Sequence, residues 1–248
     1  QLEKLDIQSL AVSSRRDPSI VFKPNRPIGN EALECEGITK SYGDLCVLKD
    51  VNLKILPGDK IALVGANGVG KSTLCKILIE ELKPDSGVVK WGATTQRGYF
   101  PQNVSEEIKG EETLYEWFRS FDKKKESGEI RNALGRMLFS GKEQEKPINA
   151  LSGGEKHRMV LSKLMLEGGN FLILDEPTNH LDLESIIALG EALYKFSGNV
   201  ICVSHDRELI DAYANRIIEL KIDSENPTNG AQIIDFRGSY EEYLESCL

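Results

Sequence analysis

A glycine-rich loop that directly follows a short apolar run restricts the fold of this chain more than any other feature. The run IALV occupies residues 61–64, and the loop GANGVGKST after it fits the pattern G-x-x-x-x-G-K-[ST]. Its glycines allow backbone N–H groups to surround phosphate oxygens, and a helix expected over residues 73–82 presents its positive N-terminus there. The alternative is a plain glycine turn into a helix. The preceding strand and following helix favour a phosphate-binding loop, in which Lys71 reaches the β- and γ-phosphates and the Ser72 hydroxyl can bind Mg²⁺.

Two more apolar runs of the same kind occur later, FLIL at residues 171–174 and VICV at residues 200–203. Each is followed at once by polar residues and a helical segment. Such runs are typical of strands that are buried on both faces of a parallel sheet. Ligands bind beyond the carboxyl ends of these strands, so the residues directly after the three runs are the first candidates for a functional site.

The residues after the second run suit phosphate chemistry. Asp175 can hold Mg²⁺ through water, and Glu176, pointing the other way, can orient or deprotonate an attacking water. Taken alone, the pair would more commonly be two acids at an exposed strand end. Beside a phosphate-binding loop, the functional interpretation of the pair becomes the more common one.

Two further polar side chains stand at similar positions. His205 follows the third run and either bonds a γ-phosphate or caps the next helix, and its surroundings must decide between the two. Gln102, in GYFPQN, ends a short strand-like piece and could touch both Mg²⁺ and the attacking water. Alone it would be an ordinary surface glutamine.

A second glycine pair lies in LSGGE, residues 151–155. Ser152 and Glu155 fit a capping box at the start of a helix, which explains these two residues by structure alone. It does not explain Gly153 and Gly154, since a glycine in a helix costs about 1 kcal/mol relative to alanine. Bare backbone at a helix N-terminus lets an anion approach the N–H groups closely. We therefore expect a second anion-binding turn.

Composition indicates a soluble, reduced, cytosolic protein. The apolar runs are far too short to span a bilayer, and the start carries no signal-sequence pattern. A formal net charge of −8 argues against a generally RNA-coating surface. The cysteines are odd in number, scattered and without metal-ligand spacing, which indicates neither disulfides nor zinc. They are Cys35, Cys46, Cys75, Cys202 and Cys247.

The first 30 residues differ from the rest. They begin without Met, pass from a short charged helical pattern to a Pro-containing extended segment, and offer little core. We interpret residues 1–30 as the end of a linker, and the start of the sequence suggests a fragment of a longer chain or a processed N-terminus.

The motifs occur in the order seen in ATP-binding-cassette nucleotide-binding domains, which the chain resembles over about residues 31–222. GANGVGKST, the Gln102 segment, LSGGE, LILDEP and the histidine after VICVS carry the resemblance, and Tyr42 in KSYGD looks like the aromatic that stacks on adenine. The resemblance implies an α/β fold with a P-loop parallel-sheet core, an N-terminal antiparallel β subdomain and a helical signature subdomain at about 103–168. In this family the LSGGE helix contacts the γ-phosphate of ATP held on another domain.

LDEPTNHLDLES, residues 174–185, and the C-terminal FRGSYEEYL resemble the ABC-F proteins, which are soluble tandem ATPases, many of which act on the ribosome. The resemblance implies a linker end at 1–30 and the second nucleotide-binding domain at 31–248. Only one such domain is present, so its partner is either another domain of the full-length protein or a second copy of the fragment.

The resemblance also implies the role of each site residue. ATP and Mg²⁺ are the expected cofactors, with Mg²⁺ placed by Ser72, Gln102 and Asp175. Catalysis falls to Glu176, His205, Lys71 and Gln102. The partner's site is completed by Ser152, Gly153, Gly154, Glu155 and Asp182. Nucleotide is bound by Tyr42, Gly65, Ala66, Asn67, Gly68, Val69, Gly70, Lys71, Ser72 and Thr73.

Three functions are compatible with these motifs. The first is an ATP-hydrolysing translation factor in the cytoplasm with no stable membrane partner. The second is the ATPase subunit of a membrane transporter, which the linker-like start and the NHLD sequence count against. The third is a binding module that uses ATP only to close a dimer, which the presence of both Glu176 and His205 disfavours. The basic run at residues 123–125 is interpreted as a solvated helix end rather than an RNA contact.

Overall fold

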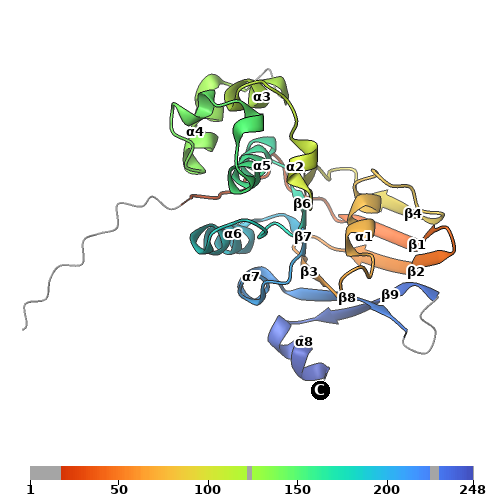
Figure 1. Ribbon diagram of the computed structural model, residues 1–248. Helices are drawn as coiled ribbons and strands as arrows, with labels where there is room; N and C mark the ends of the chain where they lie inside the picture. The colour runs from red at the N-terminus through yellow and green to blue at the C-terminus, as the bar shows by residue number, and fades with distance from the viewer. Residues whose placement is uncertain (1–17, 122–124, 224–228, 248) are drawn as a thin grey trace, which may run out of the picture.

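The computed structural model describes residues 18–121, 125–223 and 229–247. The strands of this part of the chain form one nine-stranded sheet in the order β4-β1-β2-β9-β8-β3-β7-β6-β5 (Figure 1). The strands are β1 Leu33–Tyr42, β2 Leu45–Ile55, β3 Lys60–Val64, β4 Ser86–Trp91, β5 Arg97–Phe100, β6 Phe171–Asp175, β7 Asn199–Val203, β8 Arg216–Ile222 and β9 Ala231–Arg237. The α-helices are α1 Lys71–Leu78, α2 Val104–Glu107, α3 Leu114–Phe121, α4 Ser127–Arg136, α5 Gly153–Glu167, α6 Leu183–Lys195, α7 Arg207–Tyr213 and α8 Tyr240–Ser246, and the 3₁₀ turns are η1 Glu143–Glu145 and η2 Ile148–Ala150.

The centre of the sheet is parallel, as the three apolar runs predict. Strands β8, β3, β7, β6 and β5 are parallel neighbours. Val203, at the end of β7, pairs with Leu63 of β3 on one side and with Asp175 of β6 on the other. Neighbouring runs therefore end within one residue of each other, and the polar residues that follow them emerge at the same edge of the sheet.

Both faces of this parallel region are buried. Ala62 belongs to the core on the side of the helices α2 to α7, whereas Ile61 and Leu63 belong to a second core shared with α1 and the strands β1 and β2. In Figure 1, α6 and α7 accordingly lie on one side of the central strands and α1 on the other. Alternating side chains thus bury both faces, which is why these strands read as continuous apolar runs.

Helix α1 differs from the sequence-based expectation of a helix over residues 73–82. It begins at Lys71, directly after the left-handed Gly70, so the lysine of the loop already belongs to the first helical turn. It ends at Leu78, because Glu80 has a φ of 66° and the chain turns back. The N–H groups of Glu81 and Leu82 both donate to the carbonyl of Lys76, which closes the helix end.

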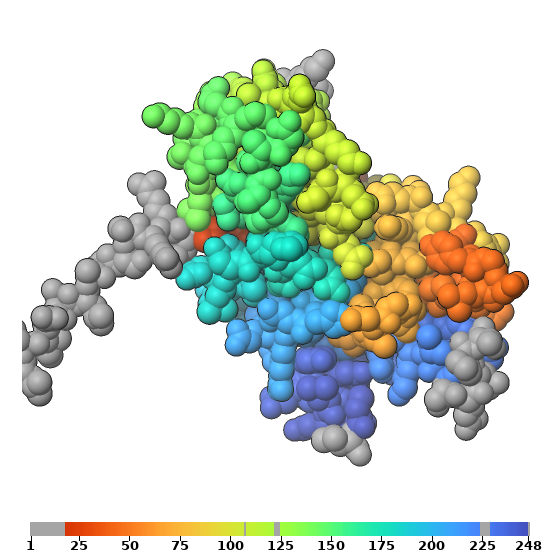
Figure 2. Space-filling model, in the orientation of Figure 1, coloured from red at the N-terminus to blue at the C-terminus, as the bar shows by residue number. Residues whose placement is uncertain are grey.

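Two lobes extend from the parallel region (Figure 2). Strands β4, β1 and β2 pair antiparallel, and a single parallel pairing of Leu48 with Ala231 joins them to β9. On the opposite side, α3, α4 and α5 form the helical lobe. Among the described residues no helix is long and apolar enough to cross a membrane. The basic run at 123–125 lies almost entirely outside the described residues.

The extended segment before β1 packs against the domain, and the expectation that it offers little core is wrong for two side chains. Ile20 and Phe22 are both 6 % exposed and belong to the helical side of the core. Backbone N–H groups of Ser19 and Asn25 donate to the carbonyls of Arg136 and Gly168 at 2.8 Å each. The assignment of residues 1–30 to a linker stays a prediction, and residues 1–17 lie outside the described part.

Candidate active site

Residues from separate parts of the chain line one cavity at the carboxyl edge of the parallel strands. The cavity has a volume of about 410 Å³. Its lining combines the loop before α1, the segment after β5, the loop after β6 and the residue two positions after β7. The lining residues are Asn67, Gly68, Gly70, Lys71, Ser72, Thr73, Gln102, Glu176, Asn179 and His205. The structure therefore brings together the polar residues that follow all three apolar runs.

The conformation of the loop requires glycine at two positions. Gly65 has a φ of 140°, and a Cβ added there would lie 2.5 Å from the carbonyl oxygen of Leu220. Gly70 has a φ of 113°, and its added Cβ would lie 2.7 Å from Cγ1 of Val47. Neither a side chain nor ordinary backbone angles fit at these positions. The fold of this chain alone therefore explains both glycines.

Lys71 is held across the loop that precedes it. Its side chain is buried, and Nζ donates to the carbonyl oxygens of Gly65 and Ala66 at 2.8 and 3.0 Å. Burial lowers the pKa of this lysine, and the nearby Glu176 and Asp175 oppose the shift. The ammonium group is thus held by two backbone carbonyls, which compensate its positive charge only in part. A bound phosphate would supply the negative charge that the carbonyls lack.

The carboxylate of Asp175 is fully buried at the end of β6. Neither of its oxygens makes a hydrogen bond of ordinary geometry among the described residues, and burial raises the pKa of the group against the opposing effect of the nearby Ser72 hydroxyl. The Ser72 hydroxyl lies nearby and donates to Oε1 of Gln102 at 3.4 Å. Buried carboxylate, hydroxyl and amide oxygens are the ligands that Mg²⁺ prefers, so these three residues fit such an ion.

Glu176 and His205 face each other across the cavity edge. Oε1 of Glu176 lies 3.3 Å from Nε2 of His205, and the Glu176 side chain is 15 % exposed against 51 % for His205. Glu176 has a φ of 54°, and its N–H donates to the carbonyl of Val203, which fixes the backbone at the strand end. The alternative role of His205 as a helix cap is wrong, because Asp206 is the N-cap residue of α7.

The second glycine turn lies at the start of α5, outside the cavity. The predicted capping box is confirmed: the Ser152 hydroxyl accepts from the N–H of Glu155, and the Glu155 carboxylate accepts from the N–H of Ser152. A Cβ on Gly154 would lie 2.9 Å from the carbonyl oxygen of His180, whereas a Cβ on Gly153 would make only ordinary contacts. Close packing thus explains Gly154 within this chain but leaves Gly153 unexplained.

Two more predicted residues also lie outside the cavity. Tyr42 ends β1 with 51 % of its surface exposed, and Nζ of Lys40 lies 5.9 Å from the centre of its ring. Asp182 is the N-cap residue of α6, where its carboxylate accepts from the N–H of Ser185 at 2.9 Å. Their expected roles toward nucleotide and partner domain stay predictions.

Sequence reasoning missed Asn179 as a site residue, although it lines the cavity together with Glu176. Its N–H donates to the carbonyl of Glu176 at 3.3 Å, which folds the chain back at the end of β6. Its place in the NHLD sequence, three residues after Glu176, is the signal that could have identified it. Val69, which the resemblance places among the nucleotide-binding residues, has its side chain buried in the core beside α1, and a role of its backbone stays a prediction.

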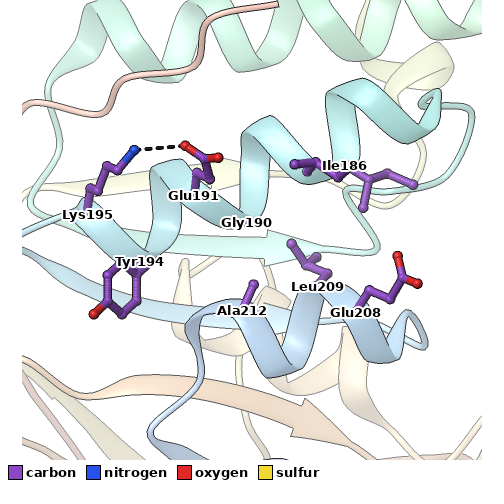
Figure 3. A pocket seen from close by; sticks show the side chains of 9 residues that line it. Ile186, Gly190, Glu191, Tyr194, Lys195, Glu208, Leu209 and Ala212 are labelled. Atoms are coloured by element: carbon purple, nitrogen blue, oxygen red, sulfur yellow. Dashed lines mark hydrogen bonds and ion pairs between the residues drawn. The ribbon is translucent and has the colours of Figure 1, made fainter.

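A second pocket of the molecule is apolar and unsuited to phosphate. It lies between α6 and α7 and is lined by side chains such as Ile187, Tyr194, Leu209 and Ala212, with the paired Glu191 and Lys195 at its rim (Figure 3). Two carboxylates, those of Glu191 and Glu208, lie at this pocket, and no glycine-rich loop among the described residues lines it. The polar cavity beside α1 is therefore the candidate active site.

A family model described as ABC transporter matches residues 48–179 of the chain. The chain is 42 % identical over 247 residues to the probable ATP-binding protein YbiT of Escherichia coli O157:H7, covering 99 % of the chain and 45 % of that protein. It is 33 % identical over 245 residues to the energy-dependent translational throttle protein EttA of Haemophilus influenzae, covering 97 % of the chain and 43 % of that protein. The chain thus spans less than half the length of these relatives.

A relative from a plant and a solved structure are also similar. The chain is 36 % identical over 251 residues to ABC transporter F family member 5 of Arabidopsis thaliana, covering 100 % of the chain and 35 % of that protein. The structure of a bacterial Atm1-family ABC exporter with ATP bound aligns with a TM-score of 0.72 at 18 % identity, covering 93 % of this chain and 42 % of the exporter chain. At this identity the structural likeness shows the fold alone.

Proposed function

Since this chain belongs to the ATP-binding-cassette family and, within it, to the ABC-F proteins, we propose that it binds and hydrolyses ATP to drive head-to-tail closure with a second nucleotide-binding domain. The convergence of Lys71, Glu176 and His205 on one cavity, next to the fully buried carboxylate of Asp175, carries this proposal. The two acids and His205 follow the adjacent parallel strands β6 and β7, and Lys71 begins the helix α1 that comes after the neighbouring strand β3. No other described cavity combines a glycine loop, a buried lysine and a strand-end glutamate.

Some residues of the site bind the phosphates, and others activate water and take up its proton. Backbone N–H groups of the loop and the ammonium of Lys71 hold the phosphates, with the positive end of α1 behind them. The Glu176 carboxylate polarises the attacking water and accepts its proton. His205, 3.3 Å from that carboxylate, orients it and would stabilise the γ-phosphate by a hydrogen bond.

Ser72, Gln102 and Asp175 would hold Mg²⁺ in this site. The ion, when bound, neutralises charge on the phosphate oxygens and orients them. The buried, unpartnered oxygens of Asp175 support this part of the proposal, since a cation would satisfy them.

The exposed turn at the start of α5 points to a role on another domain. Ser152 and Gly153 are exposed and do not line the cavity of their own chain. We assign to Ser152, Gly153, Gly154, Glu155 and Asp182 the completion of a site on a second nucleotide-binding domain. Relatives more than twice as long as this chain leave room for that domain in the same protein.

The proposed cellular role is in translation, on the ribosome, in the cytoplasm. The name of the relative EttA, an energy-dependent translational throttle protein, supports this choice. The alternative is an ATPase subunit that energises a membrane transporter, which the likeness to an exporter does not favour because it reflects the fold alone. Co-sedimentation of the full-length protein with ribosomes, against co-purification with membrane subunits, separates the two roles.

Exchanging Glu176 for Gln in the full-length protein tests the catalytic assignment. The amide cannot accept the proton of water, so we expect kcat for ATP hydrolysis to fall by roughly 10²-fold or more while ATP still binds. Glu208→Gln, at an exposed acid of α7 outside the cavity, is the matched control and keeps the parental kcat. Hydrolysis by Glu176→Gln at the parental rate would show that another group activates the water.

A further inference from the structure

Two histidines from distant parts of the sequence pack against each other between the candidate active site and the start of α5. The ring centres of His157 and His180 lie 5.3 Å apart, with an angle of 67° between the ring planes. His157 belongs to the second turn of α5, whereas His180 lies in the loop between β6 and α6. The edge-on arrangement is the one that two aromatic rings prefer.

His157 is an unusual core residue because one of its ring nitrogens is unsatisfied. The side chain is 4 % exposed, and Nδ1 lies 2.9 Å from the carbonyl oxygen of Gly153, to which it donates. Nε2 is buried and has no hydrogen-bond partner among the described residues. Burial lowers the pKa of the ring, which agrees with a neutral imidazole. A leucine would fill the same space without an unpaired nitrogen, so packing alone does not account for a histidine here.

His180 fixes the other side of the contact. It has a φ of 64°, which turns the chain, and its carbonyl oxygen comes so close to Gly154 that a Cβ there would lie 2.9 Å away. It follows Asn179, which lines the cavity, and Glu176, to whose carbonyl Asn179 donates. Two residues later Asp182 caps α6. The loop of residues 176–182 therefore leads from the strand-end glutamate to the first turn of α5.

We propose that His157 and His180 are positioning residues that hold the loop of residues 176–182 against the first turn of α5, so that Glu176 and the Ser152 turn move as one unit. The inference rests on the proposed function, because it links the group that activates water in one site to the turn that completes another. A shift of the Ser152 turn would then reach Glu176 through this ring contact and the close approach of His180 to Gly154.

The experiment uses the full-length protein and separates positioning from core packing. His157→Leu keeps the buried volume but removes the ring that His180 contacts. His180→Asn removes the other ring at an exposed position, and asparagine tolerates a positive φ, so the loop keeps its backbone. Leu164→Met, two turns further along α5 and also buried, is the control for a change in packing alone. The double variant of His157 and His180 completes a cycle.

We expect kcat for ATP hydrolysis to fall roughly tenfold in each single variant, because a small misplacement of reacting groups has a large effect on rate. The KM for ATP and the affinity for a fluorescently labelled ATP analogue should change less than about twofold, since the loop that binds phosphate is untouched. The double variant should lose no more than a single variant, and Leu164→Met should keep the parental kcat. Melting temperatures of all variants are recorded beside the rates.

Four results overturn the inference. His157→Leu with the parental kcat would make the residue a simple core filler, and His180→Asn with the parental kcat would exclude the contact even if the buried exchange unfolds the protein. Multiplied losses in the double variant, roughly a hundredfold, would show that the two rings act independently. A parental protein without ATPase activity overturns the proposed function as well, whereas activity abolished by Glu176→Gln but untouched by the histidine variants overturns the histidine pair alone.

Discussion

The two glycine-rich turns of this chain, residues 65–73 before α1 and Ser152–Glu155 at the start of α5, use the same backbone chemistry in different surroundings. Both place glycines at or beside a helix N-terminus. In the first, Gly65 and Gly70 have positive φ values and no room for a Cβ, and the turn opens onto a cavity. In the second, Ser152 and Gly153 are exposed, and a Cβ on Gly153 would meet nothing closer than 3.7 Å.

The difference separates glycines that the chain needs for its own fold from one that it does not need. Leu220 and Val47 of the same chain crowd the first turn, and His180 crowds Gly154. Nothing in the described part of the chain crowds Gly153. A glycine that the fold does not require, at an exposed helix start, is what a site completed on another molecule or domain would use. Five substitutions, in the two turns and at Asp175 beside the first, test this contrast.

Lys71→Ala should have the largest effect and acts on the first turn only. Loss of a charged donor to phosphate removes about 1.5 to 3 kcal/mol of binding, so we expect ATP affinity to fall roughly 10- to 100-fold. Titration of the single chain with a fluorescently labelled ATP analogue measures it. A circular dichroism spectrum like that of the parent shows that the fold is intact, and unchanged affinity would remove Lys71 from the phosphate site.

Ser152→Ala should leave ATP binding by the chain's own loop unchanged and lower kcat of the full-length protein roughly tenfold or more, as loss of one donor to a reacting phosphate does. Its control is Ser239→Ala, which removes the same type of capping box at the start of α8. Both exchanges weaken a helix cap by about 1 kcal/mol. Equal kcat in the two variants would reduce Ser152 to a helix cap.

Asp175→Asn should stabilise the nucleotide-free chain by about 1 kcal/mol, a common size for stabilising exchanges, while lowering activity. Burial raises the pKa of Asp175 above its ordinary value, so the folded state holds the proton to higher pH than the unfolded state. Well below pH 3.8 both states are protonated and the gain vanishes; it grows as pH rises from 3.8 toward the raised folded pKa and is constant above that pKa. Urea unfolding of the parent and the variant at about pH 3.5, 5 and 7, without Mg²⁺, measures this difference in the free energy of unfolding.

A destabilised asparagine variant at pH 7 would mean that the carboxylate has partners other than a cation. The parental chain with added Mg²⁺ and ATP should regain the difference, because a ligand that binds only the folded state stabilises it. Asp211→Asn, on the exposed side of α7, serves as the control and should show no comparable gain.

The smallest effect is expected for the two glycines at the start of α5. Gly153→Ala should stabilise the single chain by about 0.5 kcal/mol, because alanine favours the helix and its Cβ meets no close atom. Gly154→Ala should give no gain or a loss, since its Cβ would lie 2.9 Å from the His180 carbonyl oxygen. Chemical denaturation of the two variants compares them directly. Equal stabilisation by both would show that His180 does not press on Gly154.

Much of the fold follows from the sequence because local patterns carry it. Continuous apolar runs predict strands buried on both faces, and the loop pattern predicts the strand before it and the helix after it. The parallel pairing that these runs predict is confirmed, whereas the position of β7 between β3 and β6 comes from the structure alone. The cavity residues Lys71, Gln102, Glu176 and His205 were predicted for the same reason.

The contacts that the sequence does not predict join residues far apart in the chain. Asn179 and His180 take their roles from the backbone turn after β6, and positive φ at His180 has no local sequence signal. The packing of Ile20 and Phe22 depends on a surface formed by residues more than a hundred positions later, including Phe196, whose ring centre lies 6.0 Å from that of Phe22. Periodicity within a window of neighbours carries no information about such contacts.

Photocrosslinking of the full-length protein tests most directly whether the Ser152 turn acts on nucleotide held by another domain. The probe is an ATP analogue that carries an aryl azide on its γ-phosphate, and labelled peptides are identified by mass spectrometry with and without Lys71→Ala. We expect labelling of residues 151–158 that persists in Lys71→Ala, because the nucleotide that reaches this turn is bound by the other domain. Labelling of residues 151–158 that disappears with Lys71→Ala, or that never occurs, would contradict it.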